Sequence, residues 1–348
     1  MESLSPRARL TGNLGRRKIP GLDGIRGVSV LAVTAFHGVS ARVPGNAGVQ
    51  MFFLLSGLLI TWLMLEEEQA TGGIDWRAFY GRRAVRLLPA LFALLLWEIV
   101  VGRPRVSAGA ARSAALYYAN YYLATGGDLT GVTQTWSLSV EEHFYLAWPV
   151  LFLAVRNRKA LMAGCFLAAA AQTVLRAGLA VSGHLIYSMF ATETSSIGIL
   201  AGCGLALFLR QFPERLPEFL LRPWLAWAAA AGIVWTARLP AVDQAAWGIP
   251  AGIAMGAVIL LQAVAREWRL LDNPVTGFLG RISYGIYLWH LVAIDLVKNI
   301  APEGLRVAAL FGCAVTLGGL SYFAVERPAQ AWARRHFRIA RSAGPHLL

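Results

Sequence analysis

The sequence predicts an all-α polytopic membrane protein with about ten transmembrane helices and both termini on the cytoplasmic side. Composition is the first reason: 57% of the 348 residues are hydrophobic, 15% are charged, and the mean hydropathy is +0.53. A soluble domain of this size is much less apolar. The second reason is that apolar stretches long enough to cross a bilayer recur along the chain. The third is the distribution of basic residues between these stretches.

Each predicted span is an apolar stretch bounded by arginine-rich or Pro/Gly-rich turns. A transmembrane helix needs about 20 predominantly apolar residues, and these stretches approach or reach that length. In chain order, the ten predicted spans are 24–41, 47–65, 87–102, 140–155, 160–178, 190–209, 223–237, 244–264, 282–297 and 307–325.

The basic residues favour a topology with the N-terminus in the cytoplasm. With these ten spans, 24 of the 32 Lys and Arg residues fall on the cytoplasmic side and eight fall outside or near that surface. The formal net charge of +13 by itself suggests a nucleic-acid partner. We predict no such partner, because the basic residues are spread over short connections instead of gathering on one domain. The cytoplasmic groups lie in 1–26, 66–86, 156–159, 210–222, 266–281 and 327–341.

The chain is predicted to be one membrane domain over residues 1–348, with short basic cytoplasmic tails at 1–18 and 329–348. We expect no appended soluble catalytic domain, since there is no long linker and no internal repeat. The longest stretch between spans, 103–139, carries a tyrosine cluster that indicates either interfacial anchors or an outer lid. Three cysteines lie singly in apolar spans, so we predict small core residues and no metal site: Cys165, Cys203 and Cys313.

An arginine and a histidine share one face of the first predicted span. Arg26 and His37 are eleven residues apart, which at about 100° per residue brings the helix round to within about 20° of its starting direction, about 16 Å further along the axis. Arg26 is expected near the membrane surface and His37 well inside. An intramembrane histidine is a functional candidate by default, and its ordinary pKa suits proton transfer. The alternative is a histidine that only packs against a neighbouring helix.

Six short motifs follow one another along the chain. Together they resemble the acyltransferase-3 family of bacterial integral-membrane O-acyltransferases, over about residues 19–328. Each motif alone is weak, but six in order at matching spacing are hard to obtain by accident. They are Gly21–Gly27 leading to Phe36 and His37, Gly48–Thr61, Phe79–Pro89, Thr135–Tyr145, Gly280–His290 and Val325–Pro328.

The resemblance implies a multi-pass protein of the bacterial inner (plasma) membrane. Such enzymes move acyl groups, often acetyl, from cytoplasmic acyl-CoA onto hydroxyls of carbohydrates, surface glycans or secondary metabolites. Acyl-CoA is then a co-substrate, and no permanently bound cofactor is expected. The family's arginine–histidine pair corresponds to Arg26 and His37, and its Arg-x-x-Arg pattern to Arg83 and Arg86. His143 departs from the family, whose members usually carry glutamine there, and receives no role.

The chemistry of acyl transfer assigns roles to the same residues. It needs a base for the acceptor hydroxyl, donors for the developing oxyanion and a positive site for the phosphates of the acyl donor. His37 is the candidate base or, alternatively, a transient acyl carrier. Arg26 is a candidate for holding a phosphate or carboxylate, and Asp23 for orienting it through an i,i+3 pair and contacting substrate. A snorkelling Arg26 is the structural alternative.

Three arginines before the third span form a predicted donor-binding patch. Arg82, Arg83 and Arg86 suit the phosphates of coenzyme A, although anionic lipid would attract them equally. Glu141 and Glu142 open the fourth span, where one is predicted to orient or charge-balance His37 and the other to sit at the helix N-terminus.

Aromatic and polar residues near the other motifs are predicted to contact substrate. Tyr284, Tyr287 and His290 recur at i, i+3 and i+6 and can line a cavity, and Trp136 lies beside the glutamate pair. Glu326 is predicted either to pair with an inner arginine or to act as a helix stop.

The expected partners are acyl-CoA, a carbohydrate or small-molecule hydroxyl acceptor and the lipid bilayer, and the sequence carries no indication of an oligomeric state. The leading function is O-acylation of a glycan, with acetyl as the expected group. Alternatives are acylation of a secondary metabolite such as a macrolide sugar, a proton-coupled transporter, or a flippase or scaffold partner without chemistry of its own.

Overall fold

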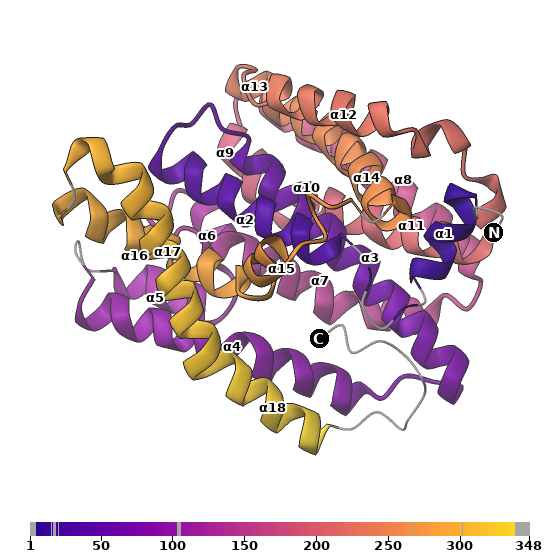
Figure 1. The fold of residues 1–348 in the computed structure, drawn as a ribbon, viewed down its shortest axis with the longest axis horizontal. Coiled ribbons are helices and arrows are strands. Elements are labelled where there is room, and N and C mark those ends of the chain that lie inside the picture. The colour runs from indigo at the N-terminus through magenta and orange to yellow at the C-terminus, as the bar shows by residue number, and fades with distance from the viewer. Residues whose placement is uncertain are drawn as a thin grey trace.

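The computed structural model describes residues 5–337 except 15, 17, 18, 20, 103–105, 267 and 301, and all regular structure in this part is helical. The helices pack side by side as a bundle (Figure 1). The α-helices are α1 Pro6–Leu14, α2 Leu22–Gly38, α3 Gly45–Thr71, α4 Trp76–Val100, α5 Ala108–Ala115, α6 Ala119–Ala124, α7 Thr135–Ala154, α8 Arg158–Val181, α9 Leu185–Phe190, α10 Thr192–Ser195, α11 Ile197–Gln211, α12 Pro223–Thr236, α13 Ala241–Asp243, α14 Ile249–Arg266, α15 Pro274–Arg281, α16 Ser283–Ile300, α17 Arg306–Ser321 and α18 Arg327–His336. Short 3-10 helices are η1 Pro213–Arg215, η2 Glu218–Leu221 and η4 Glu303–Leu305, and π-helices are η3 Gln244–Gly248 and η5 Tyr322–Glu326.

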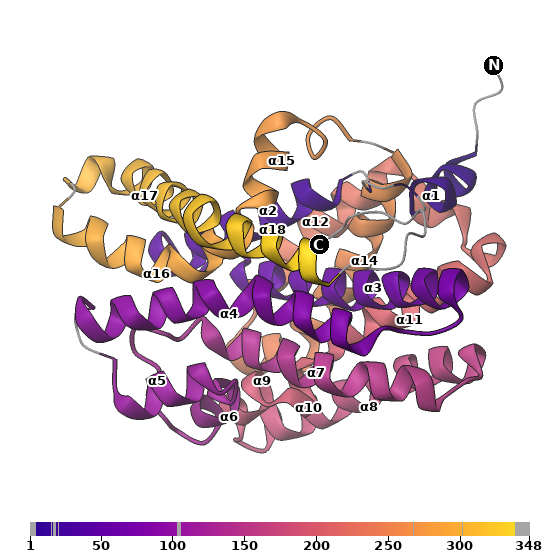
Figure 2. The ribbon, with the colours of Figure 1, turned by 90° about the horizontal axis from the view of Figure 1, so that it is seen from below.

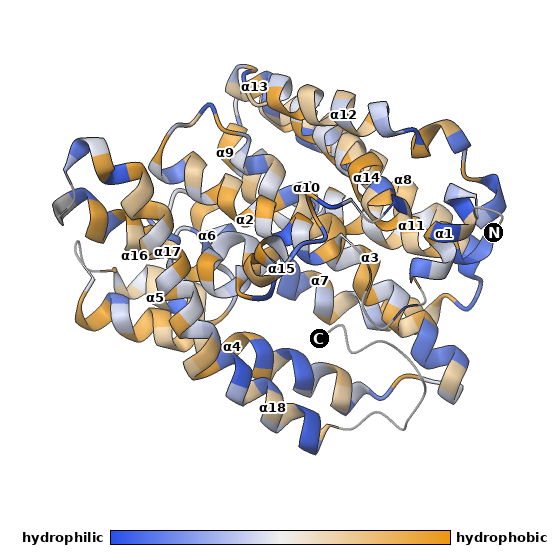
Figure 3. Ribbon diagram, viewed as in Figure 1, coloured by the Kyte–Doolittle hydropathy of each residue, from blue (hydrophilic) through white to orange (hydrophobic). Residues whose placement is uncertain are grey.

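Every predicted span lies over a helix, although the boundaries shift. By length and composition, four helical segments of the described chain are suited to cross a membrane: α3, α8, the continuous Ala241–Arg266 and the continuous Glu303–His336. Most helices are mainly hydrophobic, while hydrophilic segments lie along α4 and α18 and at several helix ends and connections (Figure 3). The helical fold and the membrane character of the chain therefore agree with the sequence prediction.

Several predicted spans differ from the helices that replace them, and the third begins at Trp76 instead of residue 87. The stretch 190–209 is broken, because the backbone is extended at Ala191 and turns again at Ser196, so that the long helix starts only at Ile197. The first span ends earlier than predicted, at Gly38 instead of residue 41.

Helix α3 is the centre of the bundle. It packs against α2, α11 and α14, and 83% of its most apolar window is buried, compared with 17% for α8. Its closest neighbour is α11, where glycines allow the two backbones to approach. A Cβ atom on Gly57 would lie 1.9 Å from the Ile199 carbonyl oxygen, and one on Gly202 would lie 2.2 Å from that of Leu54.

The short helix α15 crosses the first turns of α2 (Figure 2). This crossing is tight, since a Cβ atom on Gly280 would lie 2.0 Å from the Asp23 carbonyl oxygen. The backbone around Asp23 is therefore held in place one turn before Arg26.

Parts of the two predicted tails are packed helices. In the first tail, α1 lies against α14, and Asn13 donates a hydrogen bond of 2.7 Å to the Val264 carbonyl oxygen. In the second, α18 runs beside α4, as both ribbon views show (Figures 1 and 2). Residues 338–348 lie outside the described residues.

Candidate active site

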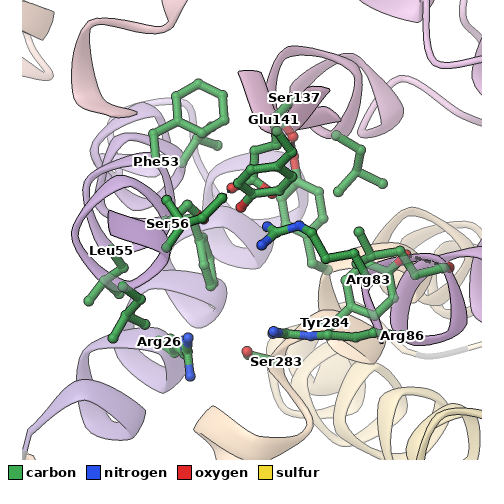
Figure 4. A pocket seen from close by; sticks show the side chains of 18 of the residues that line it. Arg26, Phe53, Leu55, Ser56, Arg83, Arg86, Ser137, Glu141, Ser283 and Tyr284 are labelled. Carbon is green, nitrogen blue, oxygen red and sulfur yellow. Dashed lines mark hydrogen bonds between the residues drawn. The ribbon is translucent and has the colours of Figure 1, made fainter. Parts of the chain in front are cut away.

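One cavity collects most of the predicted site residues. Side chains from α2, α3, α4, α7 and α16 surround it (Figure 4), and its empty space is about 970 Å³, including solvent at the mouth. We call it the arginine cavity. Its lining residues are Arg26, Val49, Phe52, Phe53, Leu55, Ser56, Leu59, Ile60, Leu63, Arg83, Arg86, Leu87, Ser137, Leu138, Glu141, Tyr145, Ser283, Tyr284 and Tyr287.

Three guanidinium groups reach into the arginine cavity from two helices. Arg26 comes from α2, and Arg83 and Arg86 come from α4. Arg26 forms the i,i+3 ion pair with Asp23, at 3.6 Å, and its side chain is 18% exposed. Neither Arg83 nor Arg86 makes an ion pair with any carboxylate of the described residues, so their charge is available to a ligand.

Glu141 is the one acidic side chain among the residues that line the arginine cavity. Ser56 on α3 donates a 2.7 Å hydrogen bond to its Oε1 atom. Arg83 points toward Glu141 in Figure 4, and its guanidinium carbon lies 3.1 Å from the centre of the Tyr145 ring. Three positive groups thus face one negative group, an excess that favours an anionic ligand with several charges.

Hydroxyl groups line the wall formed by α7 and α16. The hydroxyls of Ser137 and Tyr287 lie 2.6 Å apart, and the Tyr287 hydroxyl also donates to the Gln134 carbonyl oxygen at 3.1 Å. Tyr284 donates to the carbonyl oxygen of Leu87 at 2.9 Å, which ties α16 to α4. Both predicted tyrosines therefore line the cavity.

His37 lies outside the arginine cavity, at the other end of α2. It was predicted well inside the first span, but the helix stops at Gly38, which leaves His37 in the last turn and exposed. Its ring contacts His290 on α16, with Nδ1 of His37 3.2 Å from Nε2 of His290. His290 was expected to line the cavity and instead is fully buried beside His37.

The remaining predicted residues, Asp23 among them, do not line the arginine cavity. Arg82 lies outside the lining, and Glu142 has a buried Oε1 atom with no hydrogen-bond partner among the described residues. The ring of Trp136 packs edge-on against Phe53 and Phe190. Both glutamates lie in the second turn of α7, which begins at Thr135, so neither has the predicted place at the helix N-terminus.

Glu326, His143 and the three cysteines also lie outside the cavity lining. Glu326 is buried and accepts a hydrogen bond from Ser321 at 3.0 Å. His143 contacts the Thr192 hydroxyl at 2.8 Å, outside the cavity lining. Cys165 and Cys203 are buried core residues, as predicted, and Cys313 is half-buried.

Sequence reasoning found two hydroxyl-bearing residues of the cavity, Tyr284 and Tyr287, and missed four others. Ser56, Ser137, Ser283 and Tyr145 all line it, and each lies inside a motif that carries the family resemblance. The available signal was a hydroxyl-bearing residue inside an otherwise largely apolar motif. Within the described part of the chain, no three His, Cys, Asp or Glu side chains gather in a way suited to hold a metal ion.

Comparisons with known proteins show the family of the chain. The family model described as an acyltransferase domain matches residues 19–325. The relative named "Putative peptidoglycan O-acetyltransferase YrhL" of Bacillus subtilis is 31% identical, over 92% of this chain and 56% of its own. The peptidoglycan O-acetyltransferase OatA of Listeria monocytogenes is 28% identical, over 91% of this chain and 57% of its own. This chain thus spans little more than half the length of these relatives. No solved structure matches it.

Proposed function

The chain belongs to the acyltransferase family whose model covers residues 19–325, and we propose that it is an integral-membrane O-acetyltransferase acting on a glycan. The donor in this proposal is acyl-CoA, with acetyl as the transferred group. The acceptor is a carbohydrate hydroxyl, which is consistent with the peptidoglycan named for the two relatives.

The observation that carries the proposal is the arginine cavity. A nucleotide donor such as coenzyme A bears several phosphate charges, and burying them requires cations that are not already neutralised. Arg83 and Arg86 fulfil this condition, and Arg26 keeps part of its charge available despite Asp23. The aromatic and aliphatic lining beyond the arginines, including Phe52 and Val49, suits the less polar arm of the donor.

His37 is the base in this proposal. Its imidazole takes the proton of the acceptor hydroxyl while the hydroxyl oxygen attacks the thioester carbonyl carbon. The carbon–sulfur bond then breaks, and the leaving thiolate takes the proton back from the imidazolium, so that acetyl ester and free thiol result. Arg26 and His37 lie on one helix about 16 Å apart along its axis, which places phosphate binding and proton transfer at opposite ends of an elongated donor.

We further propose ten membrane crossings in the bacterial inner membrane, with both termini in the cytoplasm. The arginine end of α2 then faces the cytoplasm, where acyl-CoA is made, and the histidine end faces outward. Labelling tests this topology in a chain whose own cysteines are replaced by alanine. Arg42→Cys should react with a membrane-impermeant maleimide in intact cells, and Arg77→Cys only after permeabilisation. Equal reactivity of the two positions in intact cells would contradict the topology.

Mass spectrometry of surface glycans tests the function. Cells that lack this protein are rescued with the wild type or with His37→Ala, and glycans, lipids and small metabolites are compared. One added acetyl increment on a glycan with the wild type alone supports the proposal. The same increment on a small metabolite moves the acceptor to that class. Equal profiles with both forms would show that His37 does not carry the chemistry, and no change at all would favour transport or scaffolding.

A further inference from the structure

The histidine pair, His37 and His290, has hydrogen-bond partners that fix which nitrogen of each ring carries a proton. His290 is fully buried, and its Nδ1 atom lies 2.7 Å from the Tyr287 carbonyl oxygen. Its Nε2 atom lies 3.2 Å from Nδ1 of His37, which in turn lies 3.0 Å from the Val33 carbonyl oxygen. The two ring centres are 5.0 Å apart.

A carbonyl oxygen only accepts hydrogen bonds, so each nitrogen facing one must carry the proton. This places a proton on Nδ1 of His290 and another on Nδ1 of His37. Neutral His290 therefore presents an unprotonated Nε2 to His37 and accepts from its Nδ1–H, which is shared with the Val33 carbonyl. The nitrogen left without a proton on His37 is Nε2, and this atom has the free lone pair.

We propose that His290 is a positioning residue that holds His37 in the tautomer with its Nε2 free to act as the base. The inference rests on the proposed function for its consequence in catalysis, but the tautomer itself is a property of the folded protein. Neither His37 nor His290 makes an ion pair with a carboxylate in the described part of the chain. A neutral imidazole thus occupies the place that a carboxylate takes beside the histidine of a Ser-His-Asp triad.

This arrangement serves the proton transfer in two ways. It keeps the ring of His37 from rotating about its χ2 angle, although the residue is exposed in the last turn of α2. In addition, Nε2 of His290 accepts a stronger hydrogen bond once Nε2 of His37 has taken the proton of the substrate hydroxyl, because Nδ1–H of His37 then belongs to a cation. Among the described residues, the other ring in contact with His37 is Phe36, which lies edge-on at 5.0 Å between ring centres and has no hydrogen-bonding atom.

Nitrogen NMR of the full-length protein, labelled at histidine and held in lipid, reads the tautomer directly. His37 and His290 are assigned by the signals lost in His37→Gln and His290→Gln. We expect both wild-type rings to carry the proton on Nδ1, the less common tautomer in water. A proton on Nε2 of neutral His37 would overturn the proposal, whatever reaction the protein catalyses.

Three substitutions separate positioning from packing. His290→Leu removes the acceptor, His290→Gln retains one in its side-chain oxygen, and Val292→Ala removes buried methyl groups from the same helix. His290→Leu should lower kcat about 10- to 100-fold with the KM for acetyl-CoA unchanged. His290→Gln should recover most of that loss, and Val292→Ala should retain the wild-type kcat. Equal losses with Leu and Gln, in variants that elute as folded protein, would show that the acceptor atom is not what matters.

The outcomes of these two experiments distinguish a failure of the His290 proposal from a failure of the proposed function. If the NMR tautomer is as expected but no acetyl transfer occurs in any form, the histidine pair stands and the O-acetyltransferase proposal falls. If transfer occurs and depends on His37, but His290→Leu has the wild-type kcat, the function stands and the role of His290 falls.

Discussion

The two ends of α2 are built differently. At the Arg26 end, side chains from five helices converge on one cavity, and the charges are spread over three arginines and Glu141. At the His37 end, one exposed ring is held by one buried partner, His290. Binding therefore depends on a charge that several residues share, whereas proton transfer depends on a single nitrogen atom. Substitutions at the first end should mainly change KM for the donor, and those at the second end should mainly change kcat.

The largest effect is expected at the histidine end. His37→Gln removes the base, so kcat for acetyl transfer should fall about 10²- to 10⁴-fold while donor binding is retained. Transfer of radiolabelled acetyl to the acceptor measures kcat, and calorimetric titration with coenzyme A measures binding. The exposed His184 lies in the turn between α8 and α9 and outside the cavity lining, and His184→Gln is the matched control. Loss of coenzyme A binding in His37→Gln would break the proposed separation of the two ends.

The next effect is expected at the arginine end. Arg83→Met and Arg86→Met each remove a charged hydrogen-bond donor from the cavity, which should raise the KM for acetyl-CoA about 10- to 100-fold with a smaller change in kcat. Arg82→Met is the matched control, since Arg82 precedes them on α4 but lies outside the lining. A rise in KM with Arg82→Met as large as that with Arg83→Met would indicate a diffuse basic surface instead of a defined site.

Thermal unfolding sharpens the same comparison without turnover. Coenzyme A at 100 times its Kd should stabilise the folded protein by about 2.7 kcal/mol. The shift in Tm should persist in His37→Gln and be lost in the double variant Arg83→Met/Arg86→Met. Tryptophan fluorescence of the protein in detergent measures Tm. Equal shifts in Tm for the two variants would contradict our assignment of the two ends.

The smallest effect is expected where Glu141 is held. Ser56→Ala removes the 2.7 Å hydrogen bond to Glu141, and the loss of such a bond to a charged group costs about 1.5–3 kcal/mol. Glu141 shares the cavity with three arginines, and its attraction to their charges should offset part of this loss in the free energy of unfolding. Unfolding of Ser56→Ala, Glu141→Gln and the double variant forms a cycle, and strictly additive losses would mean that the two side chains do not interact.

The sequence was sufficient for the features that depend on composition and local spacing. Each of the ten apolar stretches lies over a helix, because an apolar stretch must satisfy its backbone groups internally when it lies in lipid. Four helical segments of the described chain are long and apolar enough to cross a membrane. The i,i+3 pair of Asp23 and Arg26 followed from helix geometry alone. The motifs led to the family that the later comparison shows.

Helix ends were less predictable, since they depend on few residues. Gly38 ends α2 one residue after His37, which exposes a ring expected inside the span. The extended backbone at Ala191 and the turn at Ser196 interrupt the predicted span 190–209, so that its long helix starts only at Ile197. Five polar residues do follow one another at 192–196, but a hydropathy window as long as a membrane span averages over so short a run.

By itself, the sequence determined that the chain is a helical membrane protein of the acyltransferase family and which residue types are available for its chemistry. Only the tertiary structure decided which side chains meet. Arg83 and Arg86 line a cavity that Arg82 does not, and His290 lies beside His37 instead of facing the cavity. The physical reason is that helix periodicity fixes only the face of its own helix on which a residue lies. The helix that packs against that face is determined by contacts between segments far apart in the sequence, such as the close approaches at glycines.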